Sequence, residues 1–354
     1  VEDLHDLRMA GGTTLLADHV LESGETLLVV DPAADERVDF SRLTSHRVEN
    51  LLCVPLMTRE RRLGVLLVVN SPADPPFPVE ARSAMPTLAG VASQALENSI
   101  LLGEAVQMKI AQKIQQSLLP DDPPRRAGFE LAGWSKACDA TGGDYYDFVE
   151  LDEHRIGIMI GDVSGHGLGA ALFMLTARAF LRSLLATIDG IDQVFARAND
   201  MLEADMESEQ FMTCFLGLLD TSKREIVYTS AGHDAPFLYR PSIDEFLDLD
   251  STSFPLGIMA GAEFPTTEPI PLEDGDVLVL GTDGIWEAMN PQDEEYGRER
   301  LCALVRSVST LPGSGIIGAI RSGVLEFCAG RPQRDDWTIC VVKVAGEDGI
   351  VEQE

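Results

Sequence analysis

The 354-residue sequence has few basic residues, no patterned cysteines and no long hydrophobic run. Lys and Arg number 27 against 58 Asp and Glu, a formal net charge of −31 that repels nucleic-acid backbones. The six cysteines form no CxxC pair, so we expect reduced thiols in a cytoplasmic protein, with neither a disulfide scaffold nor a structural zinc site. The longest apolar run, Leu63–Val69, suits a buried strand and is too short to span a membrane.

What the sequence does have is a globular composition, 45% hydrophobic and 24% charged. Its length predicts about two domains. Near the N-terminus, residues 50–56 and 63–70 are predicted strands of an antiparallel hairpin, because a short charged turn separates them. The predicted organisation is an α/β domain at residues 1–84, a helical linker at 85–120, a large domain at 121–346 and a tail at 347–354.

The linker carries an apolar residue at every fourth position, which places these side chains along one face of a helix. Prolines from Pro120 onward end the helix. We favour a two-helix or coiled-coil connector shared across a homodimer, and the alternative is a helix packed on its own domain. The repeating residues are Leu102, Val106, Ile110, Ile114 and Leu118.

The large domain contains short strands rich in Val, Ile and Thr, joined by tight turns, with helices inserted in pairs. This pattern predicts an α+β fold in which antiparallel sheets are flanked by helices. The predicted strands are 155–161, 212–220, 225–230, 277–281 and 337–344, and the predicted helices are 169–185 and 191–207.

Four acidic motifs lie next to glycine or at predicted strand ends. Glycine lets the backbone approach a bound ion closely, and oxygen-only ligands suit Mg²⁺ and Mn²⁺. Such a cluster would repel itself strongly without a cation. The motifs are Gly142-Gly143-Asp144-Tyr145-Tyr146-Asp147, Gly161-Asp162-Val163-Ser164-Gly165-His166-Gly167, Thr282-Asp283-Gly284-Ile285-Trp286-Glu287 and Arg334-Asp335-Asp336-Trp337-Thr338.

The set and order of these motifs resemble the bacterial branch of the metal-dependent PPM (PP2C-like) serine/threonine phosphatases, the group that includes SpoIIE and RsbU. The resemblance covers about residues 110–345 and includes 114–120, 230–236 and 254–257. It implies a C-terminal antiparallel β-sandwich flanked by helix pairs, with metal ions at one end. The implied cofactors are two Mn²⁺ or Mg²⁺ ions and a third, weaker one.

The resemblance also implies how a binuclear site would be held. Asp162 would bridge the two cations and the Val163 carbonyl would complete one shell, while Asp144 would act mostly through water. Asp283 and one of an adjacent aspartate pair would hold the second cation. The adjacent pair is Asp335 and Asp336, of which Asp335 is the favoured ligand. Glu287 is the candidate ligand of the weaker third ion.

Two cations held close together activate water for direct attack on phosphorus, so the catalytic assignments begin with Asp162 and Asp283. The leaving oxygen needs a proton, and His166 is the candidate donor. A cap on the following helix is the alternative role for His166. His233 is either a site residue or a core or rim histidine. Arg178 and Arg182 either contact the substrate or are exposed to solvent.

The N-terminal stretch resembles the later part of a GAF sensor domain. The matching segments are 24–29, 54–56 and 64–66, and residues 88–98 fit the closing helix. The opening helix and first strands of that family have no match, so we expect a partial GAF-like domain. A small-molecule ligand is implied there, but no residue is assigned to it.

Together these features predict a metal-dependent protein serine/threonine phosphatase under the control of an N-terminal sensor. By analogy with the family, its substrate would be a phosphoserine on a regulatory protein such as an anti-sigma-factor antagonist of the STAS fold. One alternative is a catalytically inactive signalling or binding module, which the retention of all four acidic motifs disfavours. The other is a metal-dependent small-molecule phosphoester hydrolase, which a substrate panel would distinguish.

Overall fold

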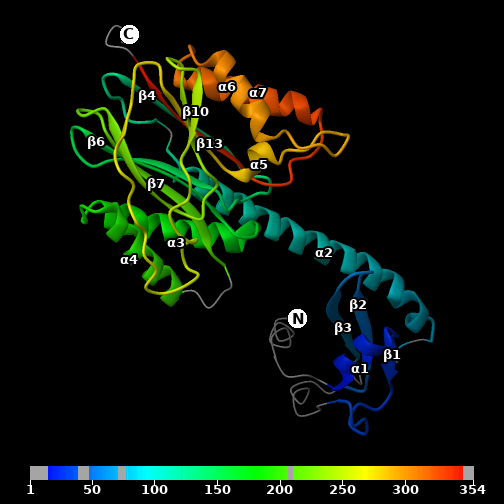
Figure 1. Cartoon of the computed structure of the whole chain (residues 1–354). Helices are drawn as coiled ribbons and strands as arrows, with labels where there is room; N and C mark the ends of the chain where they lie inside the picture. The colour runs from blue at the N-terminus through cyan, green and yellow to red at the C-terminus, as the bar shows by residue number, and fades with distance from the viewer. Residues whose placement is uncertain are drawn as a thin grey trace. The chain divides into compact units, whose positions relative to one another are not determined.

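The computed structural model describes residues 15–38, 48–70, 77, 79–120, 122–205 and 210–345. The chain divides into two compact units, Val1–Gln107 and Met108–Glu354, drawn in Figure 1. Each unit is described by itself below. The predicted tail at 347–354 lies outside the described residues, and the predicted boundaries at residues 84, 120 and 346 stay predictions.

The N-terminal unit is built on a three-stranded antiparallel sheet with a helix on each face. Its middle and last strands form the predicted hairpin, with Cys53 opposite Leu67. Successive side chains of a strand point to opposite faces, so Leu51 packs toward one helix while Leu52 packs toward the other. The elements are α1 (Leu15–Ser23), β1 (Leu27–Val29), β2 (Asn50–Met57), β3 (Arg62–Asn70) and the first part of α2 (Val79–Gln116).

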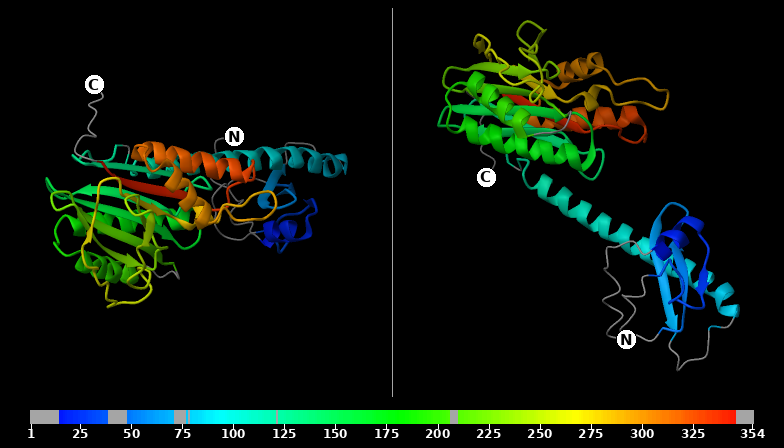
Figure 2. Two further views of the ribbon diagram at one scale, coloured as in Figure 1. Left: turned by 45° about the horizontal axis from the view of Figure 1, so that its top comes forward. Right: turned by 90° about the horizontal axis from the view of Figure 1, so that it is seen from below.

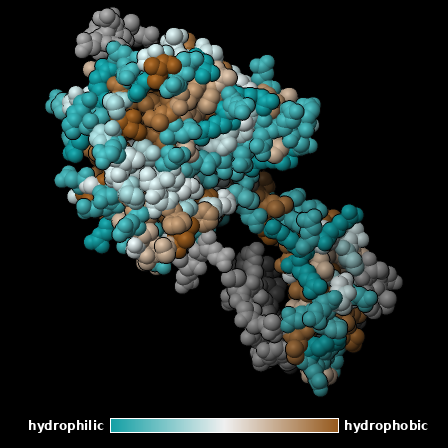
Figure 3. All heavy atoms as spheres, viewed as in Figure 1, coloured by the Kyte–Doolittle hydropathy of each residue, from teal (hydrophilic) through white to brown (hydrophobic). Residues whose placement is uncertain are grey.

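The helix α2 is continuous from Val79 to Gln116, so within one chain the connector is a single helix rather than two. The coiled-coil connector shared across a homodimer stays a prediction. Pro86 lies inside it, and the missing N–H of this proline removes one backbone hydrogen bond without ending the helix. Hydrophobic side chains lie exposed among hydrophilic ones on α2 (Figure 3). Four of the predicted apolar positions are more than half exposed: Leu102, Val106, Ile110 and Ile114.

The C-terminal unit is a sandwich of two five-stranded antiparallel sheets, and it confirms the predicted α+β architecture. One sheet has the order β11-β8-β7-β6-β5, and the other has the order β10-β9-β12-β13-β4. The strands are β4 (Phe129–Lys136), β5 (Tyr145–Glu150), β6 (Arg155–Val163), β7 (Met212–Asp220), β8 (Glu225–Ala231), β9 (Phe237–Arg240), β10 (Glu245–Asp248), β11 (Ile270–Pro271), β12 (Val277–Gly281) and β13 (Trp337–Val344).

Helices cover both outer faces of this sandwich, and Figure 2 shows them on opposite sides of the paired sheets. Residues such as Ile158 and Leu278 fill the space between the sheets. Phe173 and Phe195 anchor one helix pair on the first sheet, and Ile316 anchors a second pair on the other. The helices are α3 (Gly167–Leu185), α4 (Ile191–Asp205), α5 (Asp283–Trp286), α6 (Arg298–Val308) and α7 (Gly313–Cys328).

The strands and helices predicted for this unit are all present, with ends that differ by a few residues; the end of the predicted 191–207 helix lies outside the described residues. Among the described helices, α3 is the one whose length and apolar composition match a membrane span. Seven of its residues are buried, Phe173 and Leu181 among them. We therefore interpret α3 as a core helix.

Candidate metal centre

The four acidic motifs come together because each lies at a strand end on one end of the sandwich. Asp144 directly precedes β5, and Asp162 is the penultimate residue of β6, its antiparallel partner. Asp283 follows β12 by two residues, and Asp336 directly precedes β13, which pairs with β12. The ends of both sheets therefore contribute carboxylates to one region, as the sequence predicted.

Asp144 and Asp336 form the buried part of this region, with exposed fractions of 5% and 7%. The Thr282 hydroxyl donates to Asp144 Oδ2 at 2.7 Å. Asp336 accepts backbone N–H bonds from Cys138 at 2.8 Å and from Asp144 at 3.3 Å. Burial, followed by the charges of Asp162 and Asp336, raises the pKa of Asp144 well above its ordinary value.

Asp162 and the Val163 carbonyl face the glycine pair that precedes Asp144. A Cβ atom added to Gly143 would lie 2.9 Å from the Val163 oxygen and 3.4 Å from Asp162 Oδ1, so only glycine fits without displacing its neighbours. Burial, followed by the charges of Asp283 and other aspartates, raises the pKa of Asp162 to about 8. The bridging candidate is therefore a carboxylate that is under pressure to bind a proton or a cation.

The rim of the region is more open. Burial raises the pKa of the half-buried Asp283 to about 6, with further contributions from Asp335 and Glu287. Glu287 and Asp335 are exposed, so the adjacent pair divides between the rim, where Asp335 lies, and the interior, where Asp336 lies. Burial also raises the pKa values of Glu287 and Asp336.

This donor set fits a hard divalent cation. It offers oxygen atoms only, and the leading influences on the pKa values of its carboxyls include no basic side chain. Within the described residues, no three acidic, histidine or cysteine side chains already stand in the arrangement of a formed metal site. Hydrogen bonds hold Asp144 and Asp336 instead.

His166 lies at the N-cap position of α3, but its side chain makes no capping hydrogen bond. The residue therefore occupies the predicted cap position without a side-chain capping bond. The imidazole is 87% exposed, and its Nδ1 lies 3.3 Å from Asp139 Oδ2. Its role as a proton donor stays a prediction.

His233 lies in the core, with 3% of its surface exposed. Its Nδ1 lies 3.0 Å from the Thr213 hydroxyl, and Thr213 is the register partner of Asp162 on the neighbouring strand. Burial lowers the pKa of this imidazole to about 4, so it is neutral at pH 7. The core-histidine alternative therefore agrees with the structure.

The sequence analysis did not assign three polar residues of this region to the site, namely Thr282, Asp234 and Gln115. The Thr282 hydroxyl donates to Asp144, and Asp234 Oδ2 accepts a hydrogen bond from the Trp286 indole at 3.2 Å. The charge of Asp234 contributes to the raised pKa values of Asp283 and Glu287. Asp234 follows β8 in the quoted 230–236 segment, so its position at a strand end was the available clue. The third residue, Gln115, is treated below.

Arg178 and Arg182 face a buried carboxylate of the same unit. Arg182 donates to Asp147 Oδ2 at 2.6 Å, and Arg178 Nε lies 3.8 Å from the same atom. Asp147 is 1% exposed and also accepts a bond from the Tyr145 hydroxyl at 2.8 Å. Both arginines belong to α3 and Asp147 belongs to β5, so these contacts join the helix to the strand.

Arg182→Ala is expected to lower the free energy of unfolding by about 1–2 kcal/mol, because it removes a charge-assisted bond from a buried carboxylate. The exposed Arg197 of α4 provides the control, and Arg197→Ala should change stability by less than about 0.5 kcal/mol. Urea denaturation of both variants tests this expectation. Equal stability of the two variants would contradict it.

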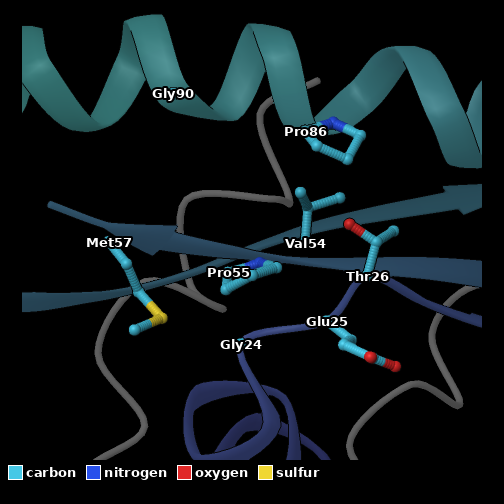
Figure 4. Close-up of a pocket in the computed structure, with 8 residues that line it drawn as sticks. All are labelled: Gly24, Glu25, Thr26, Val54, Pro55, Met57, Pro86 and Gly90. Atoms are coloured by element: carbon cyan, nitrogen blue, oxygen red, sulfur yellow. The ribbon is translucent and has the colours of Figure 1, made fainter. Parts of the chain in front are cut away.

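The N-terminal unit contains a separate cavity of about 600 Å³ between its sheet and α2 (Figure 4). Thr26 and Val54 of the sheet side point toward Pro86 of α2. The Thr26 hydroxyl is buried and has no hydrogen-bond partner among the described residues. This volume is within the range of small-molecule sites.

Comparisons with known proteins agree with this fold and site. The SiaA PP2C domain of Pseudomonas aeruginosa superposes with a TM-score of 0.61 at 21% identity, covering 69% of this chain and 98% of that one. The RsbU and RsbW domains of Rv1364c from Mycobacterium tuberculosis give 0.54 at 25% identity, covering 63% and 61%. The C-terminal unit thus has the fold of a PP2C-type phosphatase.

The family follows from the sequence matches. The family model of stage II sporulation protein E (SpoIIE) matches residues 152–345, more than half of the chain, and the GAF domain model matches residues 1–96. The chain therefore belongs to the SpoIIE family, and the resemblance found in the sequence is confirmed. Phosphatases of this family are in general metal dependent.

Phosphoserine phosphatase RsbU of Bacillus subtilis is 33% identical to this chain over 181 residues. The matched region is 51% of this chain and 53% of RsbU, so this chain spans about half the length of that relative.

Proposed function

We propose that this protein is a metal-dependent protein serine/threonine phosphatase that hydrolyses a phosphoserine on a regulatory protein. The observation that carries the proposal is the group of carboxylates at one end of the sandwich, with raised pKa values and oxygen donors only. Phosphoryl transfer to water requires positive charge at the reacting oxygens, which an acidic chain of net charge −31 must obtain from bound cations.

The proposed ligands divide between the interior and the rim. Asp162 would be a ligand of both cations. The Val163 carbonyl would bind one of them, and Asp144 would act mostly through water. Asp283 and Asp335 would hold the second, with Glu287 available to a third and Asp336 ordering the loop around Asp144. Bound there, Mn²⁺ or Mg²⁺ would supply activation of water and neutralisation of the phosphoryl charge.

The remaining steps fall to side chains of the chain itself. The serine leaving oxygen needs a proton, and the proposed donor is His166, whose exposed imidazole would be oriented by Asp139. A cavity of about 180 Å³ adjoins the rim between α5 and the segment before β13, and its lining includes Glu287, Arg334 and Asp335. We propose that Arg334 there contacts the substrate near its phosphate.

The substrate assignment rests on the relatives. RsbU carries the name phosphoserine phosphatase, and RsbU and RsbW domains occur together in the Mycobacterium tuberculosis structure. We propose a phosphorylated anti-sigma-factor antagonist of the STAS fold as the substrate. The GAF-type unit would control the activity through a small molecule bound in the cavity of Figure 4. The exposed face of α2 would form a homodimer contact.

The test is hydrolysis of para-nitrophenyl phosphate by the full chain with Mn²⁺, with Mg²⁺ and with EDTA. We expect turnover only with metal, and at least about a hundredfold loss in Asp283→Asn, which removes one ligand charge. Asp250→Asn, a change at an exposed aspartate outside the region, is the matched control.

Three results would decide between this function and its alternatives. Absence of both turnover and Mn²⁺ binding would favour the inactive binding module. Turnover of small phosphoesters together with no release of phosphate from a serine-phosphorylated STAS-fold protein would favour the small-molecule hydrolase. Metal-dependent release of phosphate from that protein is the expected result.

A further inference from the structure

The last turn of α2 buries one polar side chain. Gln115 is 6% exposed, whereas its neighbours Ile114 and Gln116 are both exposed. The two ends of its amide bond the same residue: Nε2 donates to the Gly142 carbonyl at 2.6 Å, and the Gly142 N–H donates to Oε1 at 3.1 Å. Two hydrogen bonds to the same residue, one on each side of its Cα, fix the position and the orientation of the Gly142 backbone.

Gly142 begins the first acidic motif and touches another candidate ligand. A Cβ atom on Gly142 would lie 2.0 Å from Asp336 Oδ2, so its backbone and that carboxylate are in close contact. The next residue, Gly143, faces the Val163 carbonyl, and the Asp144 N–H donates to Asp336. A displacement of Gly142 would therefore move Asp144 and Asp336 relative to Val163.

Attachment of this segment to the domain does not depend on Gln115 alone. Leu119 packs against two of the hydrophobic clusters of the C-terminal unit. The Tyr146 hydroxyl donates to the Pro120 carbonyl at 3.2 Å. Loss of the Gln115 amide should consequently leave the fold intact and change mainly the placement of the Gly142–Asp144 loop.

We propose that Gln115 is a positioning residue that links the end of α2 to the Gly142–Asp144 loop and thereby sets the affinity of the site for divalent cations. The proposal rests on the proposed metal-dependent phosphatase function. Since α2 begins at Val79, a shift of its last turn would act directly on the Gly142–Asp144 loop through the Gln115 side chain. Residues that orient metal ligands commonly change metal affinity by 10- to 100-fold when they are lost.

The experiment compares two Gln115 variants of the full chain with a neighbour on the same turn. Gln115→Ala removes both bonds, and Gln115→Glu keeps the length and the acceptor but places an oxygen against the Gly142 carbonyl. Gln116→Ala is the matched control. Titration calorimetry measures the Mn²⁺ dissociation constant, para-nitrophenyl phosphate turnover is measured against Mn²⁺ concentration, and melting in EDTA measures the metal-free fold.

We expect both Gln115 variants to weaken Mn²⁺ binding by about 10- to 100-fold, with turnover recovering when Mn²⁺ is raised to saturation. Gln116→Ala should match the wild type. Wild-type affinity in both Gln115 variants would overturn the proposal, even if their metal-free melting temperature fell. If the wild-type chain itself bound no Mn²⁺, the proposed function would fail and this proposal with it. If Gln115→Ala does not fold, Gln115→Glu alone decides.

Discussion

Asp162→Asn is expected to make the metal-free protein more stable at pH 8 while removing the proposed phosphatase activity. Burial, followed by the charge of Asp283, raises the pKa of Asp162 in the folded state to about 8, against 3.8 for an ordinary aspartate. The folded state therefore holds a proton that the unfolded state has lost. The stabilising contribution of this proton is complete below pH 3.8 and disappears as the pH rises through about 8.

Asparagine has no charge to repel its neighbours, so the variant should lose less stability than the wild type between pH 5 and pH 8. We expect a gain on the order of 2 kcal/mol at pH 8 in EDTA, measured by urea denaturation at several pH values. Asp250→Asn, at an exposed carboxyl, should show the wild-type pH dependence. A variant with the same slope as the wild type would contradict the expected repulsion.

Addition of Mn²⁺ should reverse the order of stability. A cation that binds only the folded state stabilises it by about 2.7 kcal/mol at a concentration 100 times its dissociation constant. The wild type would gain this energy, and Asp162→Asn, without the bridging ligand, would not. Turnover in the variant should fall at least about a thousandfold, because the charge that is proposed to hold both cations is gone. Repulsion among these carboxylates would thus lower the stability of the metal-free protein, while the same carboxylates would bind the cations that the function needs.

The carboxylates of this region were predictable because each belongs to a local pattern. Asp162 directly follows the predicted strand 155–161, between a glycine and a valine. Asp283 lies just after the predicted strand 277–281, in a turn that contains a glycine. Strand ends of a sandwich meet at common edges, so a sequence that places acids there predicts their convergence. The same logic predicted the hairpin at residues 50–70 and the helices α3 and α4.

The contacts that support these carboxylates could not be predicted, because they join residues far apart in the chain. Thr282 and Asp144 are 138 positions apart, and Cys138 and Asp336 are 198 apart. No periodicity relates such residues. Five described strands of the C-terminal unit were missed, namely β4, β5, β9, β10 and β11. The two-residue β11 is too short for alternation to be recognised. Asp147 belongs to the same sequence motif as Asp144, yet its carboxylate pairs with Arg182 of α3.

Gly284→Ala is expected to disrupt both stability and activity, because Gly284 is the point of closest approach between α5 and the segment leading into β13. A Cβ atom there would lie 2.0 Å from the backbone oxygen of Asp336 and 3.2 Å from the Trp337 ring. A backbone oxygen cannot rotate away as a side chain would, so α5 or the start of β13 must move. Either movement separates Asp283, at the start of α5, from Asp336.

We expect a loss of about 3 kcal/mol in the free energy of unfolding from overpacking, and about a hundredfold loss of metal-dependent turnover from a ligand displaced by roughly 1 Å. Gly318→Ala is the matched control, because Gly318 lies exposed on α7 with no atom within 4 Å of its Cβ position. Alanine there should be neutral or stabilise the helix by about 0.5–1 kcal/mol. Wild-type Mn²⁺ affinity and turnover in Gly284→Ala would show that metal binding does not depend on the distance between Asp283 and Asp336. The proposed metal ligands would then have to be assigned to other residues.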